Sequence, residues 1–123
     1  MGWMEKIEKF INKMGIGRYE KYSDGFILYV IGKERTVKVH VVVKDPYLGV
    51  KTFFKHPTKD EVPDIYGRLL KLNGETFMVK WYIDDDGDIY VATERLLRDM
   101  QFSEFETAVK MVVMAYEENI DRI

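Results

Sequence analysis

The sequence predicts an α+β fold with a mostly antiparallel sheet, and three observations predict it. Short runs of alternating apolar residues stand in groups separated by turn signals. Amphipathic segments flank or interrupt these groups at residues 3–14, 62–73 and from 103 onward. No Gly/Ser-rich or Pro-rich linker divides the 123 residues, so a single domain, residues 1–123, is expected.

The first segment, residues 3–14, has helical periodicity. Its apolar residues fall on one stripe and its charges on the opposite side, and the stripe consists of Trp3, Ile7, Phe10, Ile11 and Met14. Gly15 follows at once and predicts the helix end, because glycine enters the left-handed conformation without steric cost.

Up to four strands follow the first helix. The runs are RYEKYS, FILYVI, TVKVHVVVK and YLGVKTFFK, and the third alternates apolar and polar residues in its first half. Asp24-Gly25 and Asp45-Pro46 predict turns between them. Three or four strands are therefore expected before the middle helix.

The second half of the chain predicts a helix, a hairpin and a helix. Ile65, Leu69 and Leu72 share one face of residues 62–73, and TFMVKWYI and DIYVAT form the two hairpin strands. Ser103 and Glu106 have the spacing of a capping box, in which each side chain satisfies a backbone N–H of the first turn. The last helix is therefore expected to open at Ser103.

Composition is typical of a cytoplasmic protein. There is no cysteine, which excludes disulfides, thiolate nucleophiles and cysteine-ligated zinc, and the charged N-terminus does not resemble a secretory signal. Lys and Glu supply 24 of the 40 charges, a bias found in thermophilic proteins.

Charge is unevenly distributed along the chain. Residues 1–59 carry 12 basic and 6 acidic side chains, and residues 60–123 carry 7 basic and 15 acidic ones. This asymmetry has two interpretations, a chance distribution along a folded chain or a dipole that steers a charged partner.

The acidic stretch YIDDDGDIYV, residues 82–91, is interpreted as a turn. An EF-hand alignment with Gly87 at position 6 places Tyr82 at position 1 and Thr93 at position 12, so the bidentate glutamate is missing. Asp86-Gly87 between two alternating runs instead predicts a hairpin of type I′. A weak cation site is the alternative.

No residues predict catalysis, and no cofactor or metal is expected. His40 and His56 are interpreted as isolated structural or surface residues, and the two serines lie in a turn and at a helix start. Without a converging base and nucleophile, a non-enzymatic protein is expected.

The polar face of the middle hairpin supports a nucleic-acid hypothesis. If residues 36–44 and 47–55 pair, one exposed aromatic ring stands among basic side chains, which suits single-stranded nucleic acid. This candidate face consists of Lys38, His40, Lys44, Lys51, Phe53 and Lys55. The competing interpretation is a solvated face whose lysines prevent edge pairing.

Two further features indicate protein contacts. Gly67 lies inside a predicted helix, where glycine is unfavourable, and close approach of another backbone would explain it. Met111 and Met114 widen the last helix's apolar stripe, and together with Trp3 and Phe10 they are the candidate partner-binding residues.

The segments LLKLNGETFMVKWYIDDDGDIYVATE and FSEFETAVKMVVMAYEENID resemble the YbjN-like family, whose fold resembles that of class I type III secretion chaperones. The resemblance implies an α-β-β-β-α-β-β-α sandwich, a homodimer and a non-enzymatic role in binding extended client segments. The dimer contact that it implies consists of Ile65, Tyr66, Gly67, Leu69 and Leu70.

Two function hypotheses follow from the sequence. The first is a homodimeric, chaperone-like protein-binding module with an unidentified protein client. The alternative is a nucleic-acid-binding domain that uses the Lys-rich middle hairpin.

Overall fold

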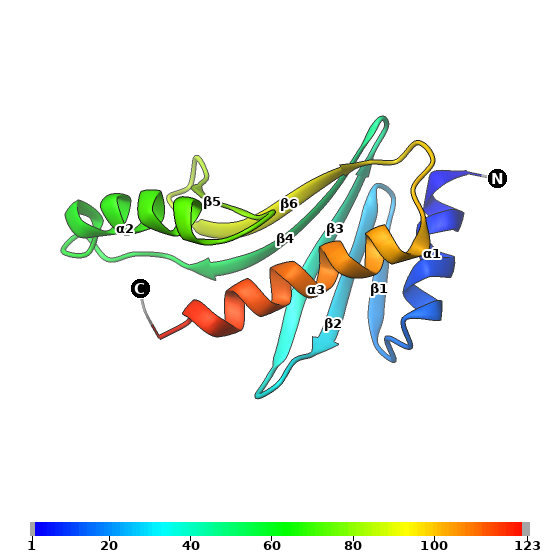
Figure 1. Ribbon diagram of the computed structural model, residues 1–123, viewed down its shortest axis with the longest axis horizontal. Helices are drawn as coiled ribbons and strands as arrows, with labels where there is room; N and C mark the ends of the chain where they lie inside the picture. The colour runs from blue at the N-terminus through cyan, green and yellow to red at the C-terminus, as the bar shows by residue number, and fades with distance from the viewer. Residues whose placement is uncertain (1, 122–123) are drawn as a thin grey trace.

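The computed structural model describes residues 2–121. The chain folds in the order α1 (Trp3–Lys13), β1 (Tyr19–Tyr22), β2 (Gly25–Ile31), β3 (Thr36–Lys44), β4 (Tyr47–Lys55), α2 (Val62–Glu75), β5 (Lys80–Ile83), β6 (Ile89–Leu96) and α3 (Phe102–Asn119). Figure 1 shows α1 beside β1 and α2 near β5, with α3 running across the strands between them. The predicted α+β class is confirmed, with four strands before α2.

The six strands form one antiparallel sheet in the order β1-β2-β3-β4-β6-β5. The order follows the sequence except at β6, which inserts between β4 and β5. The pairing of β4 with β6 brings the end of the middle hairpin beside the second hairpin. This arrangement determines which side chains of β4, β5 and β6 lie close together.

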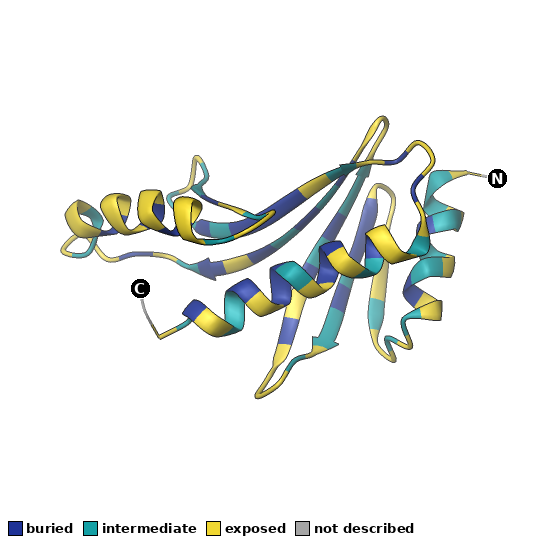
Figure 2. Ribbon diagram, viewed as in Figure 1, coloured by how far each residue is buried: buried dark blue, intermediate teal, exposed yellow. Residues whose placement is uncertain are grey.

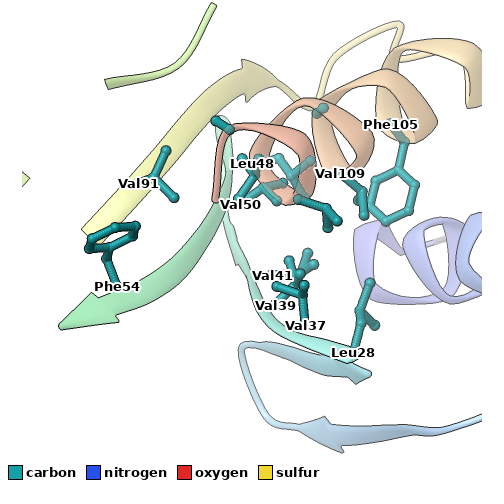
Figure 3. Packing of buried hydrophobic residues seen from close by; sticks show 14 of the residues in the cluster. Leu28, Val37, Val39, Val41, Leu48, Val50, Phe54, Val91, Phe105 and Val109 are labelled. Atoms are coloured by element: carbon teal, nitrogen blue, oxygen red, sulfur yellow. The ribbon is translucent and has the colours of Figure 1, made fainter. Parts of the chain in front are cut away.

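One face of the sheet, here called the helix-covered face, carries the core. Its strand residues include Leu28, Val39, Val41, Val50 and Val91, none more than 1% exposed. The helices contribute buried residues to the same cluster, among them Ile7 and Ile11 of α1 and Phe105, Val109 and Val112 of α3. Figure 3 shows Phe105 and Val109 above Val37, Val39 and Leu28.

The alternate residues form what we call the open face, which points away from α1 and α3. It includes Ile27, Tyr29, Lys38, His40, Lys51 and Phe53, all exposed or half-buried. The alternation along β3 and β4 is visible in Figure 2 as dark and light bands. Burial on one face only is what the strand periodicity predicts for a sheet covered on a single side.

The start of α3 differs from the prediction. Gln101, not Ser103, precedes the helix, and Glu104 accepts the Gln101 backbone N–H at 2.9 Å to complete a capping box. The expected pair of Ser103 and Glu106 is wrong by two residues. Glutamine has the side-chain oxygen that the box requires but is uncommon at this position, so the sequence pattern favoured Ser103.

A bulge in β4 changes the direction of that strand. Phe53 pairs with Tyr90 and Lys55 pairs with Ile89, so Phe54 is the extra residue. Bulges increase local twist and bend the strand that carries them. Pairing between β3 and β4 accordingly extends only from Lys44↔Tyr47 to His40↔Lys51, although both strands continue beyond that point.

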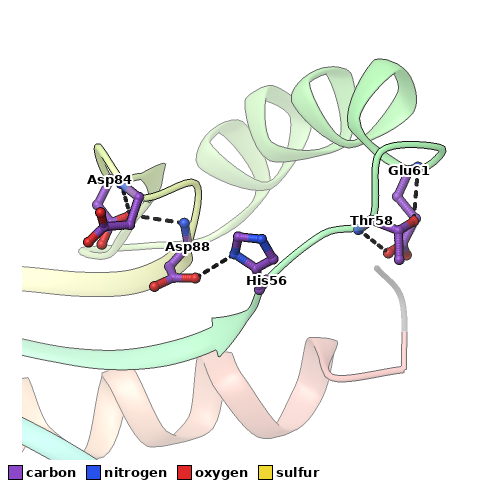
Figure 4. Close-up of polar contacts among 6 residues, drawn as sticks. His56, Thr58, Glu61, Asp84 and Asp88 are labelled. Carbon is purple, nitrogen blue, oxygen red and sulfur yellow. Dashed lines mark hydrogen bonds and ion pairs between the residues drawn. The ribbon is translucent and has the colours of Figure 1, made fainter.

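The start of α2 is fixed by two side chains. Thr58 donates its backbone N–H to Glu61 Oε1 at 2.9 Å, and Glu61 donates its own N–H to Thr58 Oγ1 at 3.3 Å. Figure 4 shows this reciprocal pair beside the first turn. The Lys55 ammonium also donates to Glu61 Oε2 at 2.6 Å, and these donors lower the pKa of Glu61 to about 2.

The end of α2 is tied to β5 through Asn73. Its side chain accepts the Trp81 N–H at 2.8 Å and donates to the Trp81 carbonyl at 3.0 Å. Trp81 is itself buried, and its ring meets Phe54 edge to face at 5.2 Å. Asn73 therefore acts as one further strand residue along the edge of β5 and fixes the helix relative to the sheet.

Among the described residues, none of the helices combines the length and the apolar character needed to cross a bilayer.

Gly25 lies where β2 and β3 approach closely, which leaves no room for a side chain. A Cβ atom at Gly25 would lie 2.1 Å from the Val41 carbonyl oxygen, whereas one at Gly49 of the same sheet would meet nothing closer than 3.8 Å. We expect Gly25→Ala to lower the free energy of unfolding by about 1–3 kcal/mol, as overpacking does. Denaturant titration measures it, and an equal loss in the matched Gly49→Ala variant would contradict the steric explanation.

The lowered pKa of Glu61 predicts that the stability of the fold depends on pH. Its folded pKa of about 2 lies below the ordinary value of 4.5, so its carboxylate stabilises the fold above pH 4.5 and loses that effect as the pH falls toward 2. The difference in unfolding free energy between the wild type and Glu61→Gln should therefore shrink across that window. Denaturant midpoints measured at several pH values test it, with exposed Glu34→Gln as the control. A difference that stays constant would disprove the role of Glu61.

Candidate protein-binding site

The acidic hairpin forms a turn, as predicted, but by a different geometry. Asp84 Oδ1 accepts the backbone N–H groups of Asp86 and Asp88 at 3.0 and 2.9 Å. Of the turn residues only Gly87 has a positive φ, at +84°, whereas a type I′ turn needs two. Asp84 thus uses its carboxylate to close the turn.

His56 is not isolated. Its Nδ1 lies 2.7 Å from Asp88 Oδ1, because pairing of β4 with β6 brings residue 56 beside the acidic hairpin (Figure 4). The interpretation of His56 as a residue without a partner was wrong. Within residues 2–121 no group of three or more His, Cys, Asp or Glu side chains could hold a metal ion.

An apolar groove lies between the end of α1, the end of β2 and the C-terminal half of α3. It has a volume of about 630 Å³, and we call it the α1–α3 groove. Its apolar lining residues are Met14, Ile16, Val30, Ile31, Val113 and Met114. Ile31 is 86% exposed and Met114 is 49% exposed, so the groove presents apolar side chains to solvent.

Glu117 fixes one wall of this groove. Its carboxylate accepts the backbone N–H groups of Lys33 and Glu34 at 2.9 and 3.1 Å, which ties the turn after β2 to α3. These two backbone donors, with Glu34 contributing most, lower the pKa of Glu117. A Cβ at Gly32 would lie 2.1 Å from the carboxylate oxygen, so a larger residue there would displace the Glu117 side chain.

The predicted partner-binding residues do not form one surface. Met114 lines the groove, whereas Trp3 and Phe10 are half-buried against the core. Phe10 meets the rings of Phe102 and Phe105, both at 5.8 Å, so it joins α1 to α3. Met111 is half-buried and lies outside the groove. Trp3 and Phe10 are thus committed to packing.

The predicted dimer residues divide in the same way. Ile65 and Leu69 are 2% and 6% exposed and belong to the core, so they are unavailable for a contact. Tyr66 and Leu70 are 54% and 74% exposed on the other side of α2. A Cβ at Gly67 would meet no atom within 4 Å.

Two residues after α2 extend its exposed surface. Phe77 is 84% exposed and Met78 is 61% exposed. We call Tyr66, Leu70, Phe77 and Met78 the α2 patch. Met78 also has a φ of +64°, a region that residues other than glycine seldom adopt and that often marks functional segments.

All residues of the predicted basic face except Lys55 belong to strand positions of the open face. Lys38, His40, Lys51 and Phe53 share it through the β2–β3 and β3–β4 registers, and Lys44 stands opposite Tyr47 at the hairpin end. Lys55 does not lie on the open face, because the bulge at Phe54 sets it opposite buried Ile89. Its ammonium pairs with Glu61. Including Lys55 in this face was wrong.

Residues 4–123 match the YbjN family, described as "Putative bacterial sensory transduction regulator". Comparison with curated proteins gives no match.

Solved structures share the fold at low sequence identity. YbjN from E. coli has a TM-score of 0.73 at 12% identity, covering 94% of this chain and 90% of that one. A chain of the ExoU–SpcU heterodimer from Pseudomonas aeruginosa has a TM-score of 0.70 at 9% identity, covering 94% and 95%. The Yersinia pestis chaperone SycH, in complex with a fragment of YscM2, has a TM-score of 0.62 at 12% identity, covering 95% and 98%.

These structures show the secretion-chaperone-like fold, and the family match covers nearly the whole chain. The chain belongs to the YbjN family.

Proposed function

We propose that this protein is a homodimeric, chaperone-like binding module without catalytic activity, which holds an extended segment of a client protein in the α1–α3 groove. The single observation that carries the proposal is the exposure of apolar residues at the groove while the core beneath it is complete. Ile31 and Met114 remain exposed, whereas Val113 at the groove's base is 7% exposed and Val112 is fully buried.

The lining of the groove suits a peptide. Besides its apolar residues it includes charged residues of both signs, namely Lys33, Lys110, Glu117 and Glu118. Covering a large aliphatic side chain contributes about 1.5–3 kcal/mol, so Ile31 and Met114 can supply much of a micromolar affinity. Methionine suits varied clients because its unbranched chain adapts to different shapes.

Positioning of the groove depends on Glu117. The groove wall at Lys33 and Glu34 is a turn, which α3 holds through two hydrogen bonds. Because this wall is already fixed, binding would cost less conformational entropy. We therefore assign Glu117 a positioning role.

The α2 patch is the proposed dimer contact. Tyr66 and Leu70 lie four residues apart and so share one exposed face of α2, with Phe77 and Met78 in the segment that follows. Gly67 adds no side chain beside them, which permits close approach of a second helix. A two-fold axis through α2 would bring the same patch of two chains together.

The solved neighbours support a role in protein binding. Two of them are named as complexes, the heterodimeric ExoU–SpcU and the chaperone SycH with a fragment of YscM2. At 9% and 12% identity they share the fold, and the proposal for this chain depends on the groove itself.

The dimer contact is testable by light scattering on protein eluted from a sizing column. At tens of micromolar, the wild type should have twice the 14.6 kDa mass of one chain. Leu70→Glu should have the single-chain mass, because a dimer would bury two unpaired carboxylates. The control is Ile31→Glu, which places the same charge at an exposed site outside α2. A wild-type mass of one chain would remove the dimer from the proposal.

The groove is testable by client capture. Immobilised wild-type protein is exposed to nuclease-treated lysate of the source organism, and retained proteins are identified by mass spectrometry. Met114→Glu should reduce retention of the same proteins about 5- to 30-fold, as loss of about 1–2 kcal/mol at an anchor residue does.

Leu96→Glu is the matched control for this capture, since Leu96 is 60% exposed in β6 and lies outside the groove. Circular dichroism confirms that each variant is folded. Equal retention by Met114→Glu and the wild type would contradict the groove as the client site.

A further inference from the structure

A row of three aromatic rings crosses the open face, and the sequence had indicated only one of them. Phe53, Tyr90 and Tyr82 come from β4, β6 and β5, which are neighbours in the sheet. The rings of Phe53 and Tyr90 meet at 5.9 Å, and those of Tyr90 and Tyr82 stack at 5.7 Å with an interplanar angle of 18°. We call these three residues the aromatic row.

Lysines border the row. The Lys51 ammonium lies 5.0 Å from the centre of the Tyr90 ring, and Lys80 lies 5.5 Å from that of Tyr82. Lys38 and Lys44 follow along β3 on the same face, where both are exposed. Positive charge thus extends from the row along β3.

Acidic groups limit where an anion could lie. Glu94 is paired with Lys80 at 2.6 Å, which neutralises that end of the row. Glu20 accepts the Tyr22 hydroxyl at 2.6 Å at the far edge of the face, and the acidic hairpin lies beyond Tyr82 and Tyr90. Lys38, Lys44 and Lys51 lie along β3 and β4 between these acidic groups, so a phosphate backbone would follow these two strands.

A cavity opens beside Phe53 where β3 and β4 separate. Its volume is about 350 Å³, and Lys38, His40, Thr52, Phe53 and Tyr116 are among the residues that line it. Thr52 is 3% exposed, and its hydroxyl has no hydrogen-bond partner within the described chain. Thr52 alternates with Phe53 along β4 and so points to the helix-covered side, and the cavity therefore reaches between the two strands.

We propose that the open face binds single-stranded nucleic acid, with bases stacked on the aromatic row and phosphates held by Lys38, Lys44 and Lys51. Every base has a π-face that can stack on an aromatic side chain, and lysine neutralises phosphate without regard to sequence. This function goes beyond client binding and uses none of the groove or α2 patch residues.

The geometry favours a single strand over a duplex. Stacking on Phe53 and Tyr90 requires unpaired bases, since a duplex keeps its base faces covered by neighbouring pairs. His40 contributes a ring at the cavity but little charge, because burial, followed by the charges of Lys38 and Lys51, lowers its pKa. The cationic contribution therefore comes from the three lysines.

Fluorescence anisotropy with labelled dT20 and rU20 oligonucleotides tests the proposal. Three phosphate contacts on a single strand predict that affinity falls roughly 20-fold between 50 and 200 mM salt. Phe53→Ala should weaken binding about 5-fold or more, the effect of losing one stacked base. Tyr90→Phe should bind as the wild type does, because it retains the ring. The two oligonucleotides distinguish DNA from RNA as the source of the strand.

Matched controls separate this face from general charge and apolar effects. Lys51→Glu and Lys9→Glu make the same change in net charge, and only Lys51→Glu should abolish binding. Phe77→Ala removes an exposed ring from the α2 patch and should bind like the wild type. Absence of saturable binding to either oligonucleotide, or equal losses in the control variants, would overturn the proposal.

Discussion

Burial of one sheet face beneath α1 and α3 is the constraint on which the rest of the structure depends. The strand residues of that face and the apolar stripes of both helices form a single cluster, with Phe105, Val109 and Val112 of α3 fully buried. Because α3 crosses the sheet, its C-terminal half meets the end of β2 and forms the groove there (Figure 1). The uncovered side of the same sheet becomes the open face, so both candidate surfaces result from one packing event.

The sequence predicted the fold well because helices and strands each produce their own regular spacing of apolar residues. Alternation in residues 36–44 and the stripe of residues 3–14 each depend on local spacing, which survives in the folded protein. Local spacing also indicated Met114, Tyr66 and Leu70 as candidate contact residues, and all three are exposed. Ile65 and Leu69 failed as dimer residues because they form the stripe that binds α2 to its own core, and one stripe cannot serve both contacts.

The errors about His56, Lys55 and the aromatic row share one physical origin, the insertion of β6 between β4 and β5. Local sequence patterns give each strand its faces but not its neighbours, and here the spatial order departs from the chain order. That order places Tyr90 between Phe53 and Tyr82, and brings His56 to Asp88. The bulge at Phe54 is equally invisible, because it follows from pairing with β6, and it removes Lys55 from the open face.

The charge asymmetry of the sequence has a partial structural counterpart. Lys38, Lys44 and Lys51 from the basic half gather on β3 and β4 of the open face, while Glu104, Glu117 and Glu118 of the acidic half belong to α3 on the helix-covered side. A net charge of −2 averages over this separation and conceals it. Because electrostatic attraction is screened within about 10 Å at ordinary salt, an anionic partner responds to the local lysines rather than to the whole chain. A net acidic protein can therefore present a basic face.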